Sequence, residues 1–524
     1  MKNGQDKNIL KISSIENEIK KRREDIVSHR RNFYREESLM KRRKEKTYQT
    51  TKSIVDSKFN LDNQCTNSFS ELKAELSSGD LTRKIKAAIE VRKILSVEKN
   101  PPIQEVINSN MLPILVEFLH HSDSEDLQFE AAWILTNIAS GTTEQTSEIV
   151  KYGAVSIFID LIQSKNENLK EQSIWALGNI AGDSCKYRDV VLEQKILVPL
   201  LNQINLSNKI SFLRNATWTL SNLCRGKPGP DHTYLKDILY GLTKLIFSED
   251  SEILGDVCWA LSYISDNSNK HVQIIIESGI IQRIVELLMH KDFNVQTPAL
   301  RIIGNIVTGD DIQTQLVINC SVIPCLLVLL NSPKKTIKKE TCWTISNIAA
   351  GNSEQIQALI DCKLFPTLIH ILKNAEIDVK KEAAWALSNA ASGGKPEQIN
   401  YLVKQGCLKP MLDLLNSTDN HLIQVLLEAI ENILRTGKVK NKNLLTNDFV
   451  KMIEQAGGLE KLENLQHHKN NNIYEISLRI LERYFETEEQ INCESDFVSE
   501  SNQVIQKHKQ IPSCSFKFFE KHDS

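Results

Sequence analysis

The sequence predicts an all-α protein in which helical repeats stack into a curved solenoid behind a basic N-terminal arm. The six tryptophans of the 524-residue chain are separated by 42, 43, 41, 84 and 42 residues, so all of them fit one period. Apolar residues around each tryptophan follow the helical spacing, and no segment shows the alternation of a β-strand. A period of this length indicates an elongated array, because one such unit cannot bury a core alone.

The charge of the chain is unevenly distributed. The formal net charge is -2, with 64 Lys and Arg against 66 Asp and Glu. Residues 1–60 contain 17 Lys and Arg against 9 Asp and Glu, so they carry +8 and the rest of the chain carries -10. A basic arm is therefore attached to an acidic body.

Composition excludes several classes of protein. Charged residues make up 25% and hydrophobic residues 41% of the chain, as in ordinary soluble proteins. The longest apolar stretch, residues 322–330, is too short to cross a bilayer, and the first residues lack the apolar core of a signal peptide. The 11 cysteines form no C-x-x-C pair. We therefore expect free thiols in a reducing compartment, no zinc site and no membrane association.

The segment around each tryptophan is predicted to form one helix of each repeat. EAAWILTNIASG, KETCWTISNIAAG and KEAAWALSNAASGG are rich in apolar residues at helical spacing and end in small residues. The gap of 84 residues equals two periods, and Arg301 stands where the missing tryptophan would fall. The tryptophans are Trp133, Trp175, Trp218, Trp259, Trp343 and Trp385.

Two further helices are predicted in each repeat. An apolar helix begins at Pro or Gly, as in MLPILVEFL and GAVSIFIDLI, because proline is tolerated in the first helical turn. A short third helix, such as SEIVKYG or SEQIQALIDC, completes each unit. Periods of about 40–47 residues with two or three helices are typical of armadillo and HEAT repeats. We expect about ten repeats over residues 72–486, arranged as a right-handed armadillo-repeat superhelix.

A polar residue accompanies each tryptophan on the same helix face. An asparagine follows four residues after five of the tryptophans and after Arg301, whereas Trp259 is followed by Tyr263. Residues three before and four after a given position share its helix face. The asparagines are Asn137, Asn179, Asn222, Asn305, Asn347 and Asn389. The residues three positions before each tryptophan are Glu130, Gln172, Asn215, Asp256, Glu340 and Glu382.

This ladder of indoles and carboxamides is predicted to bind a ligand. A single tryptophan on a helix usually belongs to a core, and a single asparagine is usually a cap or a solvated residue. Repetition weakens that interpretation, since asparagine disfavours helices and a buried amide needs partners. Carboxamides pair with the N–H and C=O of an extended peptide, while indoles and carboxylates favour Lys and Arg side chains. The expected ligand is an extended, Lys- and Arg-rich segment.

The chain resembles the importin alpha family over residues 15–486. The phrases WALGNIAGDS, CWALSYISDN and ASGTTEQT, and GGLEKLENLQ followed by ILERYF, are similar to those of the family. The resemblance implies an adaptor, without enzymatic activity or cofactor, that carries proteins with Lys/Arg-rich nuclear localisation signals between cytoplasm and nucleus. It implies three partners, namely basic cargo proteins, importin beta and a nuclear export receptor.

The resemblance also assigns the ladder to two peptide sites. In the family the ladder lines a concave groove, and a key lysine pocket uses a Gly carbonyl, a Thr hydroxyl and an Asp. The implied major site comprises Trp133, Asn137, Gly141, Thr146, Trp175, Asn179, Asp183, Asn215, Trp218 and Asn222. The implied minor site comprises Arg301, Asn305, Val307, Thr314, Trp343, Asn347, Glu382, Trp385 and Asn389. The residues implied to add acidic character or to form the spacer between the sites are Glu130, Asp256, Trp259 and Tyr263.

The basic arm is expected to bind a carrier and to compete with cargo. Residues 20–46 contain 12 Lys and Arg against 5 Asp and Glu. This composition fits a nucleic-acid binder, an idle solvated tail or a segment that binds acidic protein surfaces. The resemblance favours the last, since residues 1–60 are similar to the importin-beta-binding domain and the start of its linker, which folds back into the groove when free; no direct nucleic-acid contact is expected. The implied residues are Arg22, Arg23, Arg30, Arg31, Lys41, Arg42 and Arg43.

Other functions fit the sequence less well. An armadillo-repeat scaffold in adhesion or signalling, of the catenin kind, binds acidic or phosphorylated segments and needs Lys and Arg where this ladder has Trp, Asn, Asp and Glu. A helical repeat that reads RNA needs a basic groove, whereas the body is acidic. No glycine-rich phosphate loop and no metal-binding histidine pair is present in the sequence. Residues 487–524 form a polar, weakly acidic tail without an assigned role.

Overall fold

The structure is a computed structural model of the chain, and it describes residues 68–97, 100–440 and 447–485, with the side chains of 438–440 excepted. Within these ranges the regular secondary structure consists of α-helices and one 3-10 helix. The chain divides into two compact units, the first ending at Thr367 and the second beginning at Leu368. The arm residues predicted to bind importin beta lie outside the described residues, as does the tail at 487–524.

One helix of each repeat carries the ladder position, and these are called the ladder helices. In the first unit they are α4 (Leu81–Leu95), α7 (Glu125–Ala139), α10 (Glu167–Asp183), α13 (Ile210–Cys224), α15 (Ser251–Ser265), α18 (Phe293–Ile306) and α21 (Lys335–Ala349). In the second unit they are α24 (Ile377–Gly393), α27 (Asn420–Lys440) and α30 (Asn471–Tyr484). The described ranges thus contain ten ladder helices, as expected from the period.

The remaining helices precede the ladder helices along the chain. The apolar helices are α3 (Phe69–Leu76), α6 (Leu112–Phe118), α9 (Ala154–Leu161), α12 (Leu197–Leu206), α14 (His232–Leu245), α17 (Ile281–Leu287), α20 (Val322–Leu329), α23 (Leu364–Asn374), α26 (Leu408–Asp413) with the 3-10 helix η2 (Leu414–Asn416), and α29 (Gly458–Leu465). The short helices are α5 (Ile103–Asn108), α8 (Thr143–Lys151), α11 (Cys185–Glu193), α16 (Asn269–Glu277), α19 (Asp311–Asn319), α22 (Ser353–Asp361), α25 (Pro396–Lys404) and α28 (Asp448–Gln455).

Side-chain caps fix where several ladder helices begin. Ser124, Asn166 and Asp250 are the N-caps of α7, α10 and α15, and each accepts a hydrogen bond from a backbone N–H of the first turn. Such a cap contributes about 0.5–2 kcal/mol relative to alanine. By contrast, α13, α21 and α24 begin without a side-chain cap, so capping fixes the start of only some of the ladder helices.

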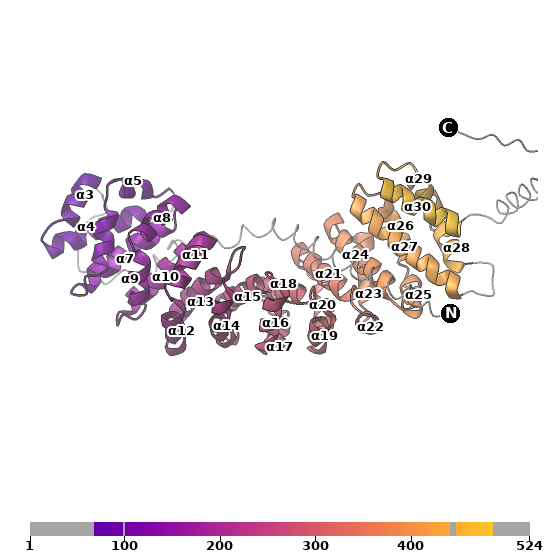
Figure 1. Ribbon diagram of the computed structural model, residues 1–524, viewed down its shortest axis with the longest axis horizontal. Helices are drawn as coiled ribbons and strands as arrows, with labels where there is room; N and C mark the ends of the chain where they lie inside the picture. Colours follow the sequence, from indigo (N-terminus) through magenta and orange to yellow (C-terminus); the bar gives the residue numbers. More distant parts are fainter. Residues whose placement is uncertain (1–67, 98–99, 441–446, 486–524) are drawn as a thin grey trace, which may run out of the picture. The chain divides into compact units, whose positions relative to one another are not determined.

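The ladder helices of each unit pack against their neighbours in chain order. In the first unit α4, α7, α10, α13, α15, α18 and α21 form an unbroken series of contacts (Figure 1). In the second unit α24 contacts α27, and α27 contacts α30. Leu177, Ile180, Leu220 and Leu223 are fully buried between these helices. The all-α repeat architecture predicted from the sequence is therefore confirmed.

One repeat of the first unit departs from the expected three helices. Between α13 and α15 there is a single helix, α14, and no short helix precedes it. The loop Gly226 to Pro230 occupies that place, and its two prolines lack the N–H that a helix needs. Arg188 donates to the carbonyls of Arg225 and Pro228 at 2.8 and 2.7 Å, which ties this loop to the preceding repeat. The prediction of a third helix in every unit was wrong here.

The described residues bear on three further features of the composition. Among them no single helix is long and apolar enough to cross a membrane, and α19 and α20 meet that criterion only as a pair bent by 81°. The described ranges contain no cluster of three or more metal-ligating side chains. The cysteines in these ranges are free thiols, and burial raises the pKa of Cys258 and Cys407 to about 12.

Candidate functional site

The tryptophan–asparagine pairs lie at equivalent positions on successive ladder helices. The pairs on α7, α10 and α13 are Trp133 with Asn137, Trp175 with Asn179, and Trp218 with Asn222. These three helices contact one another in that order. The fold therefore converts a spacing of about 42 residues in the sequence into a row of pairs on neighbouring helices.

The exposure of the indoles is uneven. Trp133 is 7% exposed and Trp218 is fully buried, whereas Trp175, Trp259, Trp343 and Trp385 are half-buried. A half-buried indole offers one face or edge to a ligand while the other packs on the protein. Four of the six tryptophans thus have the partial exposure that the ladder hypothesis requires, and two are enclosed by the chain.

Small residues on one ladder helix seat the indole of the next. A methyl group at Gly178 would overlap Cζ3 of Trp218, and a methyl group at Gly304 would overlap Cζ3 of Trp343. Both glycines lie three residues after the ladder position of their own helix. These seats were not predicted from the sequence, although the signal was present, since the same position is small in the other tryptophan repeats. Those residues are Thr136, Ser221, Ser262, Ser346 and Ser388.

Three of the asparagines connect their ladder helix to the one before it. Asn179 Nδ2 donates to the carbonyl of Thr136 at 3.2 Å, and Asn222 Nδ2 donates to the carbonyl of Gly178 at 2.9 Å. Asn305 Nδ2 likewise donates to the carbonyl of Ser262 at 3.3 Å. The acceptor is again the residue three places after the ladder position, so each carboxamide is held in a fixed orientation by the neighbouring repeat.

Two ladder carboxamides retain unused hydrogen-bonding capacity. Within the described residues, Oδ1 of Asn222 and Nδ2 of Asn347 are buried and have no hydrogen-bond partner. A buried polar atom without a partner costs about 1–3 kcal/mol. Each of these atoms would therefore gain free energy from a hydrogen-bond partner.

The residues implied to form a lysine pocket lie in the loop after α7, on α8 and at the end of α10. Thr143 Oγ1 donates to Oδ1 of Asp183 at 3.2 Å, which joins the two repeats. Thr146 is buried, and its hydroxyl lies within hydrogen-bond distance of the carbonyls of Thr142 and Ala139. Gly141 and Asp183 are half-buried. The structure thus brings the carboxylate of Asp183 to the start of α8, beside the segment that contains Gly141.

Acidic residues at the position three before the ladder residue are largely buried. Glu130, Asp256 and Glu382 are buried, whereas Glu340 is half-buried, as is Asn215, the carboxamide at the same position of α13. A buried carboxylate requires a cationic or hydrogen-bonding partner. Glu340 is paired with an arginine of the preceding ladder helix.

The ladder is interrupted on α15 and α18. Trp259 stacks on Tyr263 with ring centroids 6.0 Å apart, so the indole packs on the residue that replaces asparagine. Arg301, which replaces tryptophan, is joined to Glu340 of α21 by an ion pair of 2.7 Å. A cation of the chain itself therefore occupies the ladder position here.

The remaining predicted site residues are divided between the two units. In the first unit Val307 and Thr314 are buried beside the end of α18 and on α19, and Asn347 is buried on α21. In the second unit Glu382 is buried and Trp385 and Asn389 are half-buried, all on α24. Each unit thus contains at least one tryptophan–asparagine pair.

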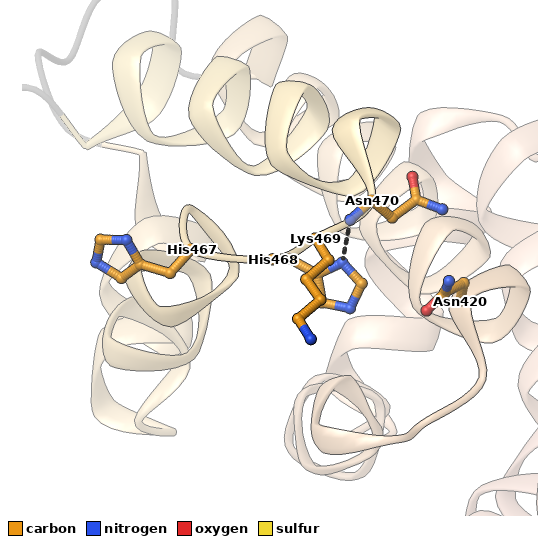
Figure 2. Close-up of a pocket in the computed structure, with 5 residues that line it drawn as sticks. All are labelled: Asn420, His467, His468, Lys469 and Asn470. Atoms are coloured by element: carbon orange, nitrogen blue, oxygen red, sulfur yellow. Dashed lines mark hydrogen bonds between the residues drawn. The ribbon is translucent and has the colours of Figure 1, made fainter.

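The second unit also contains an open pocket away from the ladder positions. It lies at the starts of α27 and α30 and is lined by Asn420, His467, His468, Lys469 and Asn470 (Figure 2). The N–H of Asn470 donates to Nδ1 of His468 at 3.1 Å. His467 points away from the other residues of the pocket (Figure 2), so the adjacent histidines do not converge on a metal position.

Comparison with known sequences defines the class of the protein. The Armadillo/beta-catenin-like repeat matches residues 99–140, 142–182, 184–225, 268–308, 310–350, 352–392 and 395–435, and the Atypical Arm repeat matches residues 447–497. A crystallised engineered protein superposes with a TM-score of 0.71 at 28% identity and covers 79% of this chain and 98% of its own. The chain is an armadillo-repeat protein.

Curated relatives identify the family within that class. Importin subunit alpha-B of Dictyostelium discoideum is 52% identical over 92% of this chain and 94% of its own. Importin subunit alpha-2 of Arabidopsis thaliana is 50% identical over 92% of both chains. This chain belongs to the importin alpha family, whose members are adaptors rather than enzymes. The family resemblance predicted from the sequence is confirmed.

Proposed function

We propose that this chain is a nuclear import adaptor that binds extended, Lys- and Arg-rich signals along α7, α10 and α13. The observation that carries the proposal is the repetition of one tryptophan–asparagine pair on three ladder helices in contact. Membership of the importin alpha family supports it. The protein would accordingly move between cytoplasm and nucleus.

The spacing of the ladder matches that of an extended peptide. Packed helices lie about 8–10 Å apart, and an extended chain rises about 3.3 Å per residue, so each repeat meets two to three peptide residues. The free Oδ1 of Asn222 would accept a peptide N–H. Between the carboxamides, the exposed part of Trp175 would contact the stem and head of a lysine or arginine. Asp183 would supply a charge-assisted bond to the ammonium group.

The interruption on α15 and α18 would separate two binding segments. The ion pair of Arg301 with Glu340 neutralises a carboxylate and places a cation where a peptide lysine would bind. Beyond it, Trp343 and Asn347 repeat the pair, and Nδ2 of Asn347 is an unused donor. A signal with two basic clusters would therefore bind the α7–α13 ladder with one cluster and α21 with the other.

The basic arm would couple cargo binding to the carrier. Tethered by a short linker, the cluster Lys41-Arg42-Arg43 would compete with cargo at an effective concentration of millimolar order. Importin beta would remove this competitor when it binds the arm, and an export receptor would return the free adaptor to the cytoplasm. Replacing these three residues by alanine in the full chain should tighten binding of a Lys-rich peptide; unchanged affinity would exclude autoinhibition by this cluster.

Separate titrations with two peptides test the proposal against its main rival. The full chain is titrated with a fluorescent Lys-rich peptide and, separately, with an acidic phosphopeptide of the same length. We expect binding of the basic peptide that weakens with salt and no measurable binding of the acidic peptide. Preference for the phosphopeptide would instead favour an adhesion or signalling scaffold.

A further inference from the structure

A buried arginine of the first repeat occupies the face of the first ladder tryptophan. Arg92 lies on α4, is 2% exposed, and its Cζ is 4.5 Å from the centroid of the Trp133 ring. Its Nε donates to Oε2 of Glu130 at 2.5 Å, and Glu130 is fully buried. Glu130 stands three residues before Trp133, so one arginine contacts both the carboxylate and the indole of the same ladder helix.

This arrangement reproduces what the proposed function requires of a peptide cation. A slot in the ladder lies between the ladder positions of two consecutive helices, and a guanidinium there would stack on an indole and bond to a carboxylate. On α4 the ladder position holds Val91, 42 residues before Trp133. The slot before Trp133 therefore has one indole wall, and the neighbouring Arg92 already fills it.

Arg301 provides a second instance of the same design. It lies on the ladder helix before Trp343 and is paired with Glu340, three residues before that tryptophan. Both runs of tryptophan–asparagine pairs therefore begin with an arginine that comes from the preceding repeat and binds the first carboxylate. Arg301 is 25% exposed, whereas Arg92 is buried, so the earlier cation is the harder one for a peptide to displace.

We propose that Arg92 is an intramolecular ligand that closes the Trp133 end of the ladder and so limits how many consecutive basic residues a bound segment can use. The inference rests on the proposed function and deepens it, because it assigns Arg92 as a specificity-determining residue. Since Arg92 is part of the chain, it returns to Glu130 faster than a free peptide lysine can replace it. A basic residue beyond the slot between Trp133 and Trp175 gains nothing in the natural protein.

The test measures how much one additional lysine in the peptide changes the Kd. Full-chain variants are titrated with a Lys-rich peptide that spans α7, α10 and α13. They are also titrated with two longer peptides, one with an extra lysine at its N-terminus and one with an extra lysine at its C-terminus. In the natural chain the extra lysine should change Kd by less than about twofold at the end next to Trp133. In Arg92→Met, which keeps an unbranched side chain, the same lysine should tighten binding about tenfold, because Glu130 and the indole become available.

In a second variant the extra lysine is expected to weaken binding where in Arg92→Met it tightens it. Glu130→Gln leaves the cation of Arg92 without its counter-charge, so the extra lysine at that end should weaken binding about threefold to tenfold. The matched control is Arg283→Met, which removes an arginine that lies 5.8 Å from the Phe247 ring and pairs with Glu286 on α17, outside the ladder. It should leave the effect of the extra lysine on Kd unchanged.

The possible results distinguish failure of this inference from failure of the proposed function. One result is that Arg92→Met and Glu130→Gln alter thermal stability and still leave the effect of the extra lysine on Kd as in the natural chain. In that case Arg92 forms only a structural ion pair, and the inference fails. If Arg92→Met does not fold, the sign of the Glu130→Gln effect decides alone. If the natural chain does not bind the shorter peptide at all, the proposed function fails and the inference fails with it.

Discussion

Two consecutive parts of the first unit share one fold and present different chemistry on the same helix face. On α7, α10 and α13 the ladder holds indoles followed by carboxamides, whereas α15 and α18 carry Tyr263 after Trp259 and Arg301 in place of a tryptophan. All five helices pack in one series. The repeat therefore sets where a side chain stands, and under the proposed function single substitutions at that place would decide whether it binds or repels a cation.

The contrast extends to how each part satisfies its polar groups. Asn222 uses Nδ2 to hold the preceding helix and keeps an unused Oδ1. Arg301 uses its guanidinium to neutralise Glu340. The first part thus has an unpaired acceptor that the proposed peptide could use, whereas the second has an internal ion pair at the ladder position.

The largest expected effect comes from placing an arginine, as found at the interruption, at a ladder position that holds a tryptophan. Trp175→Arg should weaken binding of a Lys-rich peptide by about hundredfold, because it removes an indole contact and adds a like charge. Fluorescence anisotropy with the full chain measures the change. Tyr240→Arg is the control, since this exposed aromatic residue lies on α14 outside the ladder. An equal loss in both variants would contradict the assignment of Trp175.

The second largest expected effect is a loss of stability when the space beside a ladder indole is filled. Gly178→Ala places a methyl group against Trp218. The strain of overpacking, about 1–3 kcal/mol, should outweigh the gain in helix propensity of about 1 kcal/mol. We expect a lower melting temperature, whereas Gly79→Ala, with nothing within 4 Å of the added atom, should melt like the natural chain. A stabilised Gly178→Ala would show that the seat yields.

Removing a single carboxamide should have an intermediate effect on binding. Asn179→Ala deletes the bond to the Thr136 carbonyl and a contact proposed for the peptide backbone. Binding of the basic peptide should weaken about tenfold, corresponding to about 1.4 kcal/mol. Calorimetric titration compares it with Asn202→Ala, which alters an exposed asparagine on α12. Unchanged affinity would mean that Asn179 only joins repeats.

The smallest expected effect is a gain at the interruption. The double variant Tyr263→Asn and Arg301→Trp restores the ladder pattern on α15 and α18. A peptide with one long basic run should bind a few-fold tighter, since an indole replaces a repelling cation while Glu340 loses its partner. The natural chain serves as the reference in the same titration. No gain with a long basic run would show that the interruption is more than a change of two side chains.

Much of the fold was predictable because repetition averages out local ambiguity. Six tryptophans on one period fixed the ladder helices, and prolines near the starts of α6 and α20 located the apolar helices. The single-helix repeat at α14 was not anticipated, because the expectation extended a regular unit across a loop that holds Pro228 and Pro230. A local proline signal should have outweighed the repeat pattern there.

For the candidate site, the sequence indicated which residue types recur on one helix face but not which groups they contact. The spacing singled out Trp175, Asn179 and Arg301 as candidates, but it could not indicate that Asn179 also donates to the preceding helix. Nor could it show that Arg92 reaches Trp133 across 41 residues, because such contacts depend on how far the ladder helices approach one another. The burial of Trp218 has the same origin, since its seat at Gly178 lies in another repeat.

A crystal structure of the full chain with a Lys-rich peptide of about ten residues tests the central claim most directly. The account predicts an extended peptide along α7, α10 and α13, with its backbone bonded to the carboxamides of Asn137, Asn179 and Asn222 and lysine side chains beside the indoles. It also predicts that Arg92 remains on Trp133. A peptide bound elsewhere, with the ladder asparagines bonded only to neighbouring repeats, would contradict the account.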